Sequence, residues 1–185
     1  MKQKGYNTTI KLVYAATSLA LCLVLPFLTG QIPKIGSMLS PIHIPVLLCG
    51  FLCGWPYGFA VGILAAPLRT FVFGMPPFPN WLFMCFEMAV YGLLTGLLYK
   101  LLPKKNIYIY INLIISMLAG RIVWGAARFA LMGLTNTSFS FKLFLSIGFV
   151  EALPGIICQI ILIPIIVMTF KKANLMPVEK NYRLK

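Results

Sequence analysis

Residues 80–101 read NWLFMCFEMAVYGLLTGLLYKL, an almost wholly apolar run that ends just before Pro103 and two lysines. A helix needs roughly 20 residues to cross about 30 Å of hydrocarbon, so this run is long enough to span a bilayer. One acid, Glu87, lies inside it. Ionisable groups are costly in hydrocarbon and usually face a cavity or an opposite charge. The run therefore predicts a transmembrane helix that carries a candidate functional residue.

The composition of the whole chain also indicates a membrane protein. Of its 185 residues, 60% are hydrophobic and 10% are charged, against about 45–50% and about 25% in soluble globular proteins. A soluble fold of this length could not bury so much apolar surface. Six helices of roughly 20 residues would use most of the chain and leave no room for a separate soluble domain. We expect an all-α membrane protein in which residues 1–185 form a single integral membrane domain.

Glycines and prolines divide the apolar sequence into separate spans. The clearest break is the stiff connection at residues 74–79, which holds three prolines. A second break at Trp55-Pro56 separates two shorter apolar runs, the first of which is short for a span unless its flanking residues join it. We expect transmembrane helices at residues 10–29, 42–54, 57–74, 80–101, 107–132 and 143–170.

Lysine and arginine gather in alternate connections, and that asymmetry predicts the orientation. Only Lys34 and Lys142 fall in the predicted outer loops, and three arginines lie within spans. The other eleven of the 16 basic residues fall in segments that are cytoplasmic if the N-terminus is inside: Lys2, Lys4, Lys11, Lys100, Lys104, Lys105, Lys171, Lys172, Lys180, Arg183 and Lys185. We therefore expect six spans with both the N- and C-termini cytoplasmic.

Charge and cysteine content exclude several other classes of protein. A net charge of +13 would fit nucleic-acid binding, but the basic residues flank the predicted spans, so we assign them to topology and to anionic lipid. The five cysteines fall in apolar runs, and the chain has one histidine and no aspartate. We therefore expect no metal site and no cofactor. The first apolar run is too long for a signal peptide and is expected to be a retained helix.

Six ionisable side chains fall inside the predicted spans, all away from the cytoplasmic half of the membrane: His43, Arg69, Glu87, Arg121, Arg128 and Glu151. Residues three, four or seven apart share a helix face. This spacing predicts one stripe on each of two spans: Asn80, Met84, Glu87 and Tyr91; Arg121, Trp124 and Arg128. We expect the two stripes and the other ionisable residues to form a polar, substrate-binding pocket open to the outside. The alternative is that Arg–Glu pairs only hold the bundle together, with an outer arginine reaching the interface.

Pairs of small residues four apart occur in three spans. In lipid such pairs let two helices approach closely, which is a main source of helix association. Ala16 and Ala20, near the cytoplasmic end of the first span, are a candidate contact for another helix. The two glycine pairs are expected to pack inside the bundle: Gly58 with Gly62, and Gly92 with Gly96.

Taken together, these features resemble the substrate-binding S components of energy-coupling factor (ECF) transporters, the vitamin uptake systems of bacteria. The strings HIPVLLCGFLCGWPYG at 43–58, APLR at 66–69 and FGMPP at 73–77 look like the group of pantothenate, folate, pyridoxine and hydroxymethylpyrimidine binders. The resemblance covers about residues 10–170 and implies a location in the bacterial cell membrane.

The resemblance also implies partners and roles. Ala16 and Ala20 match the surface that docks on a transmembrane coupling protein, which joins two cytoplasmic ATPase subunits. Residues 30–41 match the gate over the substrate, and the fourth to sixth spans match the walls of the binding site. By resemblance the protein topples in the membrane to release its vitamin, and it is not an enzyme, which agrees with the lack of a phosphate-binding Gly-Lys-Ser/Thr loop.

The charge inventory suggests the sign of the substrate. Three intramembrane arginines face two glutamates, so one buried positive charge needs a partner. An anionic B vitamin would supply it, pantothenate first, with Arg121 or Arg128 as anchor. The hydroxyl and amide groups of the vitamin could be satisfied by Asn80, Glu87 and Tyr91. Open alternatives are a neutral vitamin such as pyridoxine or hydroxymethylpyrimidine, a stand-alone secondary transporter, a structural subunit and an intramembrane enzyme.

Overall fold

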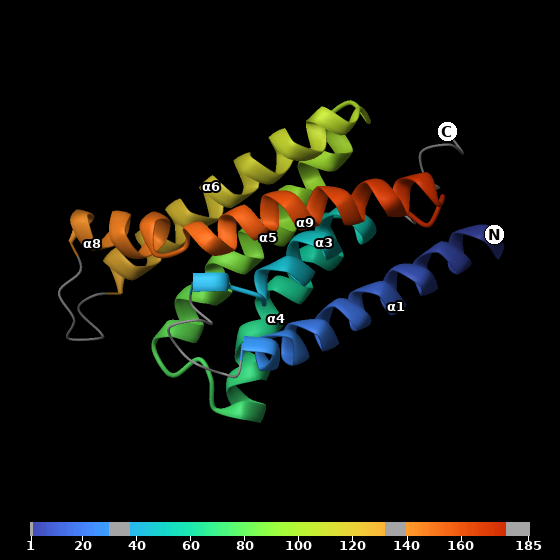
Figure 1. Ribbon diagram of the computed structural model, residues 1–185. Helices are drawn as coiled ribbons and strands as arrows, with labels where there is room; N and C mark the ends of the chain where they lie inside the picture. The colour runs from blue at the N-terminus through green and yellow to red at the C-terminus, as the bar shows by residue number, and fades with distance from the viewer. Residues whose placement is uncertain (1, 30–37, 132–139, 177–185) are drawn as a thin grey trace.

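A computed structural model describes residues 2–29, 38–131 and 140–176, and in this part of the chain it contains helices and no strands (Figure 1). The elements are α1 (Lys2–Val24), the 3₁₀ turn η1 (Leu25–Thr29), α3 (His43–Cys53), α4 (Trp55–Phe73), α5 (Asn80–Leu101), α6 (Asn106–Ala130), α8 (Phe141–Leu145), the π-helical turn η2 (Ser146–Val150) and α9 (Leu153–Lys172). The predicted all-α membrane class is supported by five helices long and apolar enough to cross a bilayer: α1, α4, α5, α6 and α9.

The short helix α3 lies in the centre of the bundle. It contacts α1, α4, α5 and α9, and all of its residues except Leu48 are buried. It has 11 residues, fewer than a membrane crossing needs. The structure therefore does not confirm the predicted total of six spans, because the second expected span is a short enclosed helix.

A single glycine separates α3 from α4. Gly54 adopts φ 94°, a region that side chains with a Cβ rarely enter. Pro56 follows in the first turn of α4, where its missing N–H costs no helical hydrogen bond. The break predicted at Trp55-Pro56 thus lies at Gly54, and α3 and α4 pack against each other on either side of it.

Glycines bring the backbones of α4 and α5 into direct contact. A Cβ on Gly92 would lie 2.0 Å from the carbonyl oxygen of Gly58, and one on Gly62 would lie 2.3 Å from that of Met88. Gly96 abuts the backbone of Trp55 in the same way. The prediction that these glycines pack inside the bundle is confirmed. We call this line of contacts the glycine seam.

The two ends of the bundle can be distinguished by the chain segments that meet there. α1 begins and α9 ends on the same side of the molecule (Figure 1). We call this the Lys100 end, after the last turn of α5. At the opposite end, the Gly74 end, α4 stops at Gly74 in a left-handed conformation (φ 70°) and α5 begins.

The expected sixth span is interrupted in the structure. Residues 141–150 form α8 and η2, and a turn at Glu151 and Ala152 precedes α9. Pro154 lies in the first turn of α9, where proline is tolerated, whereas deeper in a continuous helix it would remove a hydrogen bond. The predicted single helix over 143–170 is therefore wrong: a turn at residues 151–152 separates α8 and η2 from α9.

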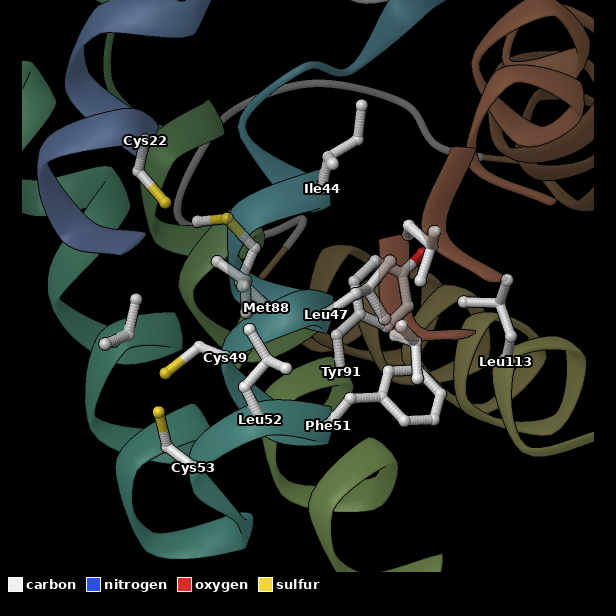
Figure 2. Packing of buried hydrophobic residues seen from close by; sticks show 14 of the residues in the cluster. Cys22, Ile44, Leu47, Cys49, Phe51, Leu52, Cys53, Met88, Tyr91 and Leu113 are labelled. Atoms are coloured by element: carbon white, nitrogen blue, oxygen red, sulfur yellow. The ribbon is translucent and has the colours of Figure 1, made fainter. Parts of the chain in front are cut away.

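The cysteines pack with apolar side chains in the described structure. Cys22 and Cys49 are fully buried and Cys53 almost so, in the cluster that includes Leu47, Phe51 and Met88 (Figure 2). The Cys22 thiol donates to the carbonyl oxygen of Ile42 at 3.5 Å, which joins α1 to the start of α3. These cysteines therefore act as small packing residues.

Candidate functional site

Glu87 is the centre of a buried polar cluster. Its side chain is 1% exposed, and three helices supply its partners. The guanidinium of Arg121, from α6, places Nη1 3.1 Å from Oε1, and the hydroxyl of Tyr91, one turn further along α5, donates to the same oxygen at 2.7 Å. The imidazole Nε2 of His43, the first residue of α3, lies 3.4 Å from Oε2. Four of the predicted site residues are thus brought together.

Helix geometry explains why the cluster forms. Glu87 and Tyr91 are four residues apart, so they share one face of α5, and this face is directed at α3 and α6. The ring of Tyr91 packs inside the apolar cluster with Leu47 and Phe51 (Figure 2). An apolar surround leaves the carboxylate no water to solvate it, so the arginine must supply the opposite charge.

His43 is held by the turn that begins α3. Its Nδ1 lies 3.1 Å from the carbonyl oxygen of Ser40, and its ring stands edge-on to Tyr91 at 5.4 Å between centroids. Ser40 adopts φ 44°, in the left-handed region. Because a carbonyl oxygen only accepts, this contact is a hydrogen bond in the tautomer with a proton on Nδ1. The other ring nitrogen therefore faces Glu87.

Two buried nitrogens of the cluster have no hydrogen-bond partner among the described residues: His43 Nε2 and Arg121 Nε. The contact of His43 with Glu87 is close but is not aligned as a hydrogen bond. An unsatisfied buried polar group costs about 1–3 kcal/mol. An ordered water or another polar group is the usual partner of such atoms in proteins.

A second group of predicted residues lies further along α6. Arg128 is half-buried, and its guanidinium carbon stands 5.1 Å from the ring centroid of Trp124 and 5.6 Å from that of Phe83. Trp124 is in turn stacked on Phe144 at 6.2 Å. Phe83 and Trp124 form a small buried cluster separate from the main core. The predicted stripe on α6 therefore begins in the polar cluster, at Arg121, and extends through Trp124 to Arg128.

Three predicted site residues lie elsewhere. Arg69 is buried, but it donates to the carbonyl oxygen of Leu23 at 2.8 Å and stands over the rings of Phe27 and Phe73 at 5.7 Å each, so it joins α4 to the end of α1. Asn80 is exposed as the first residue of α5. Glu151 is exposed in the turn before α9 and accepts from the hydroxyl of Ser146 at 3.4 Å. The structure does not bring these three to Glu87.

Uncharged buried polar residues extend the cluster. The sequence analysis did not name them as candidates, because it started from ionisable side chains. The amide of Asn112 donates to the carbonyl oxygen of Thr95 at 2.9 Å and accepts from the hydroxyl of Ser116 at 3.1 Å. Thr95 in turn donates to the carbonyl oxygen of Tyr91 at 2.7 Å. The spacing of Asn112 and Ser116, four residues apart, was the signal that could have found them.

The proposed contact on α1 has the opposite environment. Ala16 and Ala20 are exposed, as are Leu12 and Val24 on the same helix.

Residues 30–41, expected to form a gate, lie largely outside the described residues. No group of three His, Cys, Asp or Glu side chains that could hold a metal ion occurs in the described ranges.

Comparison with known proteins gives one finding. The family model described as "ECF transporter, substrate-specific component" matches residues 11–167, which is most of the chain. No curated protein and no solved structure matches it significantly.

Proposed function

The chain belongs to the family of substrate-specific components of ECF transporters, and on this premise we propose that it captures a water-soluble vitamin from outside the cell for ATP-driven uptake. The single observation that supports the proposal beyond the family is the buried Glu87 cluster, which joins a carboxylate, a guanidinium and an imidazole inside the apolar bundle. A binding component needs a protein-lined polar site inside an apolar bundle, and this cluster provides one.

The proposed orientation has both termini in the cytoplasm. The Lys100 end then faces the cytoplasm and the Gly74 end faces outside, as the distribution of basic residues favours. Glu87 lies seven residues from the start of α5, which corresponds to about 10 Å of helix, so the cluster would be reached from the outer side. In this orientation α3, with its flanking residues, takes the place of the remaining span.

The proposed substrate is an anionic B vitamin, with pantothenate first. The described helices hold three buried or half-buried arginines, and Arg121 has the Glu87 carboxylate beside it. Arg69 is satisfied by a backbone carbonyl and two rings. A carboxylate-bearing ligand anchored by Arg121 or Arg128 would balance the excess charge. A neutral vitamin such as pyridoxine or hydroxymethylpyrimidine is the second candidate, because Glu87 already compensates Arg121.

The proposed partners are a transmembrane coupling protein and two cytoplasmic ATPase subunits. The observation that supports a protein contact on α1 is that it is the least buried of the five long apolar helices: 22% of its apolar segment is buried, against 28% in α9 and 44% in α5 and in α6. Small exposed residues at Ala16 and Ala20 would let a partner helix approach closely. The chain itself would hydrolyse nothing.

The experiment that tests the proposal is mass spectrometry of small molecules carried by the protein purified from its native membrane in mild detergent. We expect a B vitamin, and we expect ATPase subunits to co-purify. A protein that carries no vitamin and purifies without ATPase subunits would favour a stand-alone secondary transporter instead.

A further inference from the structure

Polar contacts between α5 and α6 fix how these two helices align. The amide of Asn112 donates to the carbonyl oxygen of Thr95 at 2.9 Å. About two and a half turns further along α6, Nη1 of Arg121 lies 3.1 Å from Oε1 of Glu87. The residue numbers rise on α6 as they fall on α5, so the helices run antiparallel. The residue of α5 midway between the two contacts is Tyr91.

Gly120 provides the space that the ring of Tyr91 occupies. A Cβ on Gly120 would lie 2.2 Å from Cε1 of Tyr91, 2.4 Å from Cδ1 and 3.1 Å from Cζ. Carbon atoms in van der Waals contact are about 3.5–4.0 Å apart, so the ring lies directly against the backbone of α6. Any larger residue at position 120 would have to displace the ring.

The ring of Tyr91 has little room to move aside. It is 1% exposed, belongs to the apolar cluster that includes Leu47 (Figure 2), and stands edge-on to the His43 ring at 5.4 Å between centroids. Its Cζ, one of the three atoms nearest to Gly120, carries the hydroxyl that donates to Glu87 at 2.7 Å. A displaced ring would therefore take this hydrogen bond out of alignment.

We propose that Gly120 is a positioning residue of the vitamin site: by leaving space for Tyr91, it aims the phenol hydroxyl at the Glu87 carboxylate. This inference rests on the proposed function and adds to it a residue that has no functional group of its own. The hydroxyl binds Oε1, the carboxylate oxygen that also faces Arg121. The position of the ring thus sets the geometry of the carboxylate that a ligand meets, and a binding site depends on packing that holds its polar groups in place.

The first test compares binding affinities by calorimetry on the purified full-length protein in lipid nanodiscs, with pantothenate and, separately, pyridoxine as probes. Gly120→Ala and Tyr91→Phe should each weaken binding by about 10- to 100-fold, the value of one hydrogen bond to a charged group, because both variants remove the same contact. Gly148→Ala is the matched control and should bind like the wild type. It adds a methyl group at another buried glycine, where a Cβ would lie 3.6 Å from its nearest neighbour.

A second comparison separates positioning of Tyr91 from a general effect on packing. In Tyr91→Leu the ring is absent, so the methyl group added by Gly120→Ala has space. Adding Gly120→Ala to Tyr91→Leu should therefore lower neither the unfolding temperature nor the affinity any further. If Gly120→Ala weakens binding equally in both backgrounds, Gly120 does not act through Tyr91 and the proposal is overturned.

A measurement without ligand distinguishes this inference from the proposed function. In protein isotope-labelled at the tyrosine Cζ carbon, the Tyr91 resonance is identified by its loss in Tyr91→Phe, and its chemical shift reports the hydrogen bonding of the hydroxyl. Gly120→Ala should shift this resonance, and Gly148→Ala should leave it in place. An unshifted resonance in Gly120→Ala overturns the positioning role whatever the ligand. If the resonance shifts but the wild type binds neither probe, the proposed vitamin is wrong and Gly120 still positions Tyr91.

Discussion

The glycine seam and the exposed face of α1 use the same sequence pattern in opposite ways. In the seam, Gly58 and Gly92 meet backbone to backbone, so close that a Cβ on Gly92 would lie 2.0 Å from a carbonyl oxygen. On α1, Ala16 and Ala20 are four residues apart, as are the glycines of each pair in the seam, but both alanines are exposed. Small residues therefore show that a helix can be approached closely. Whether the approaching helix belongs to the same chain depends on the fold around it.

Breaking the seam should have the largest effect on the isolated protein. In Gly92→Leu, the side chain would occupy the position of the α4 backbone, which cannot shift as a flexible side chain can. We expect no monodisperse protein, measured by size-exclusion chromatography in detergent. Ala20→Leu adds the same side chain at an exposed position of α1 and should elute and unfold like the wild type. A well-folded Gly92→Leu protein would show that the seam is not tightly closed.

Removing the polar contact between α5 and α6 should have the second-largest effect on the stability of the isolated protein. Glu87→Gln removes the carboxylate that faces Arg121 at 3.1 Å and leaves a buried cation, at a cost of about 3–5 kcal/mol. Adding Arg121→Gln should restore most of the lost stability, because no uncompensated charge remains. Thermal unfolding of both variants in detergent measures the difference. Equal destabilisation by the single and the double variant would mean that the pair is not coupled.

The seam and this polar pair also show how far sequence reasoning reaches. The boundaries of α5 and the break before α4 could be predicted because glycine, proline and apolar runs act locally. The shared face of Glu87 and Tyr91 could be predicted from helical periodicity. Asn80 belongs to the same face but is exposed. Helical periodicity predicts which residues share a face, but it does not predict how far along that face the neighbouring helices extend.

The pairing of the arginines could not be predicted from the sequence. Three arginines and two glutamates lie in the apolar runs, and only the packing of the helices selects Arg121 as the partner of Glu87. Arg69 finds a backbone carbonyl at the end of α1 instead. Leu23 lies in the last turn of α1, where backbone carbonyls lack partners within the helix, so counting side-chain charges cannot reveal this contact.

Arg69 links α1 to the rest of the bundle, so its loss should have a smaller and more local effect. Arg69→Met removes the hydrogen bond to Leu23 and the contacts with Phe27 and Phe73, worth about 1.5–3 kcal/mol for a charged donor. We expect faster amide hydrogen exchange at the end of α1, with α5 unchanged. Arg69→Lys keeps the charge but not the planar fork and should give an intermediate rate. Faster exchange in α5 to the same degree would contradict a local role.

The smallest effect on the isolated protein is expected on α1 itself. In Ala16→Trp and Ala20→Trp the new ring points away from the bundle, because both alanines are exposed, so unfolding temperature and vitamin binding should match the wild type. Uptake by cells should nevertheless be lost, since the bulk would separate α1 from a partner helix. Leu12→Trp, at another exposed position of α1, measures how far the docking surface extends. Normal uptake in both alanine variants would contradict the proposed contact and would mean that the exposed face of α1 contacts only lipid. Small residues on α1 would then not mark a helix contact, unlike Gly58 and Gly92 inside the bundle.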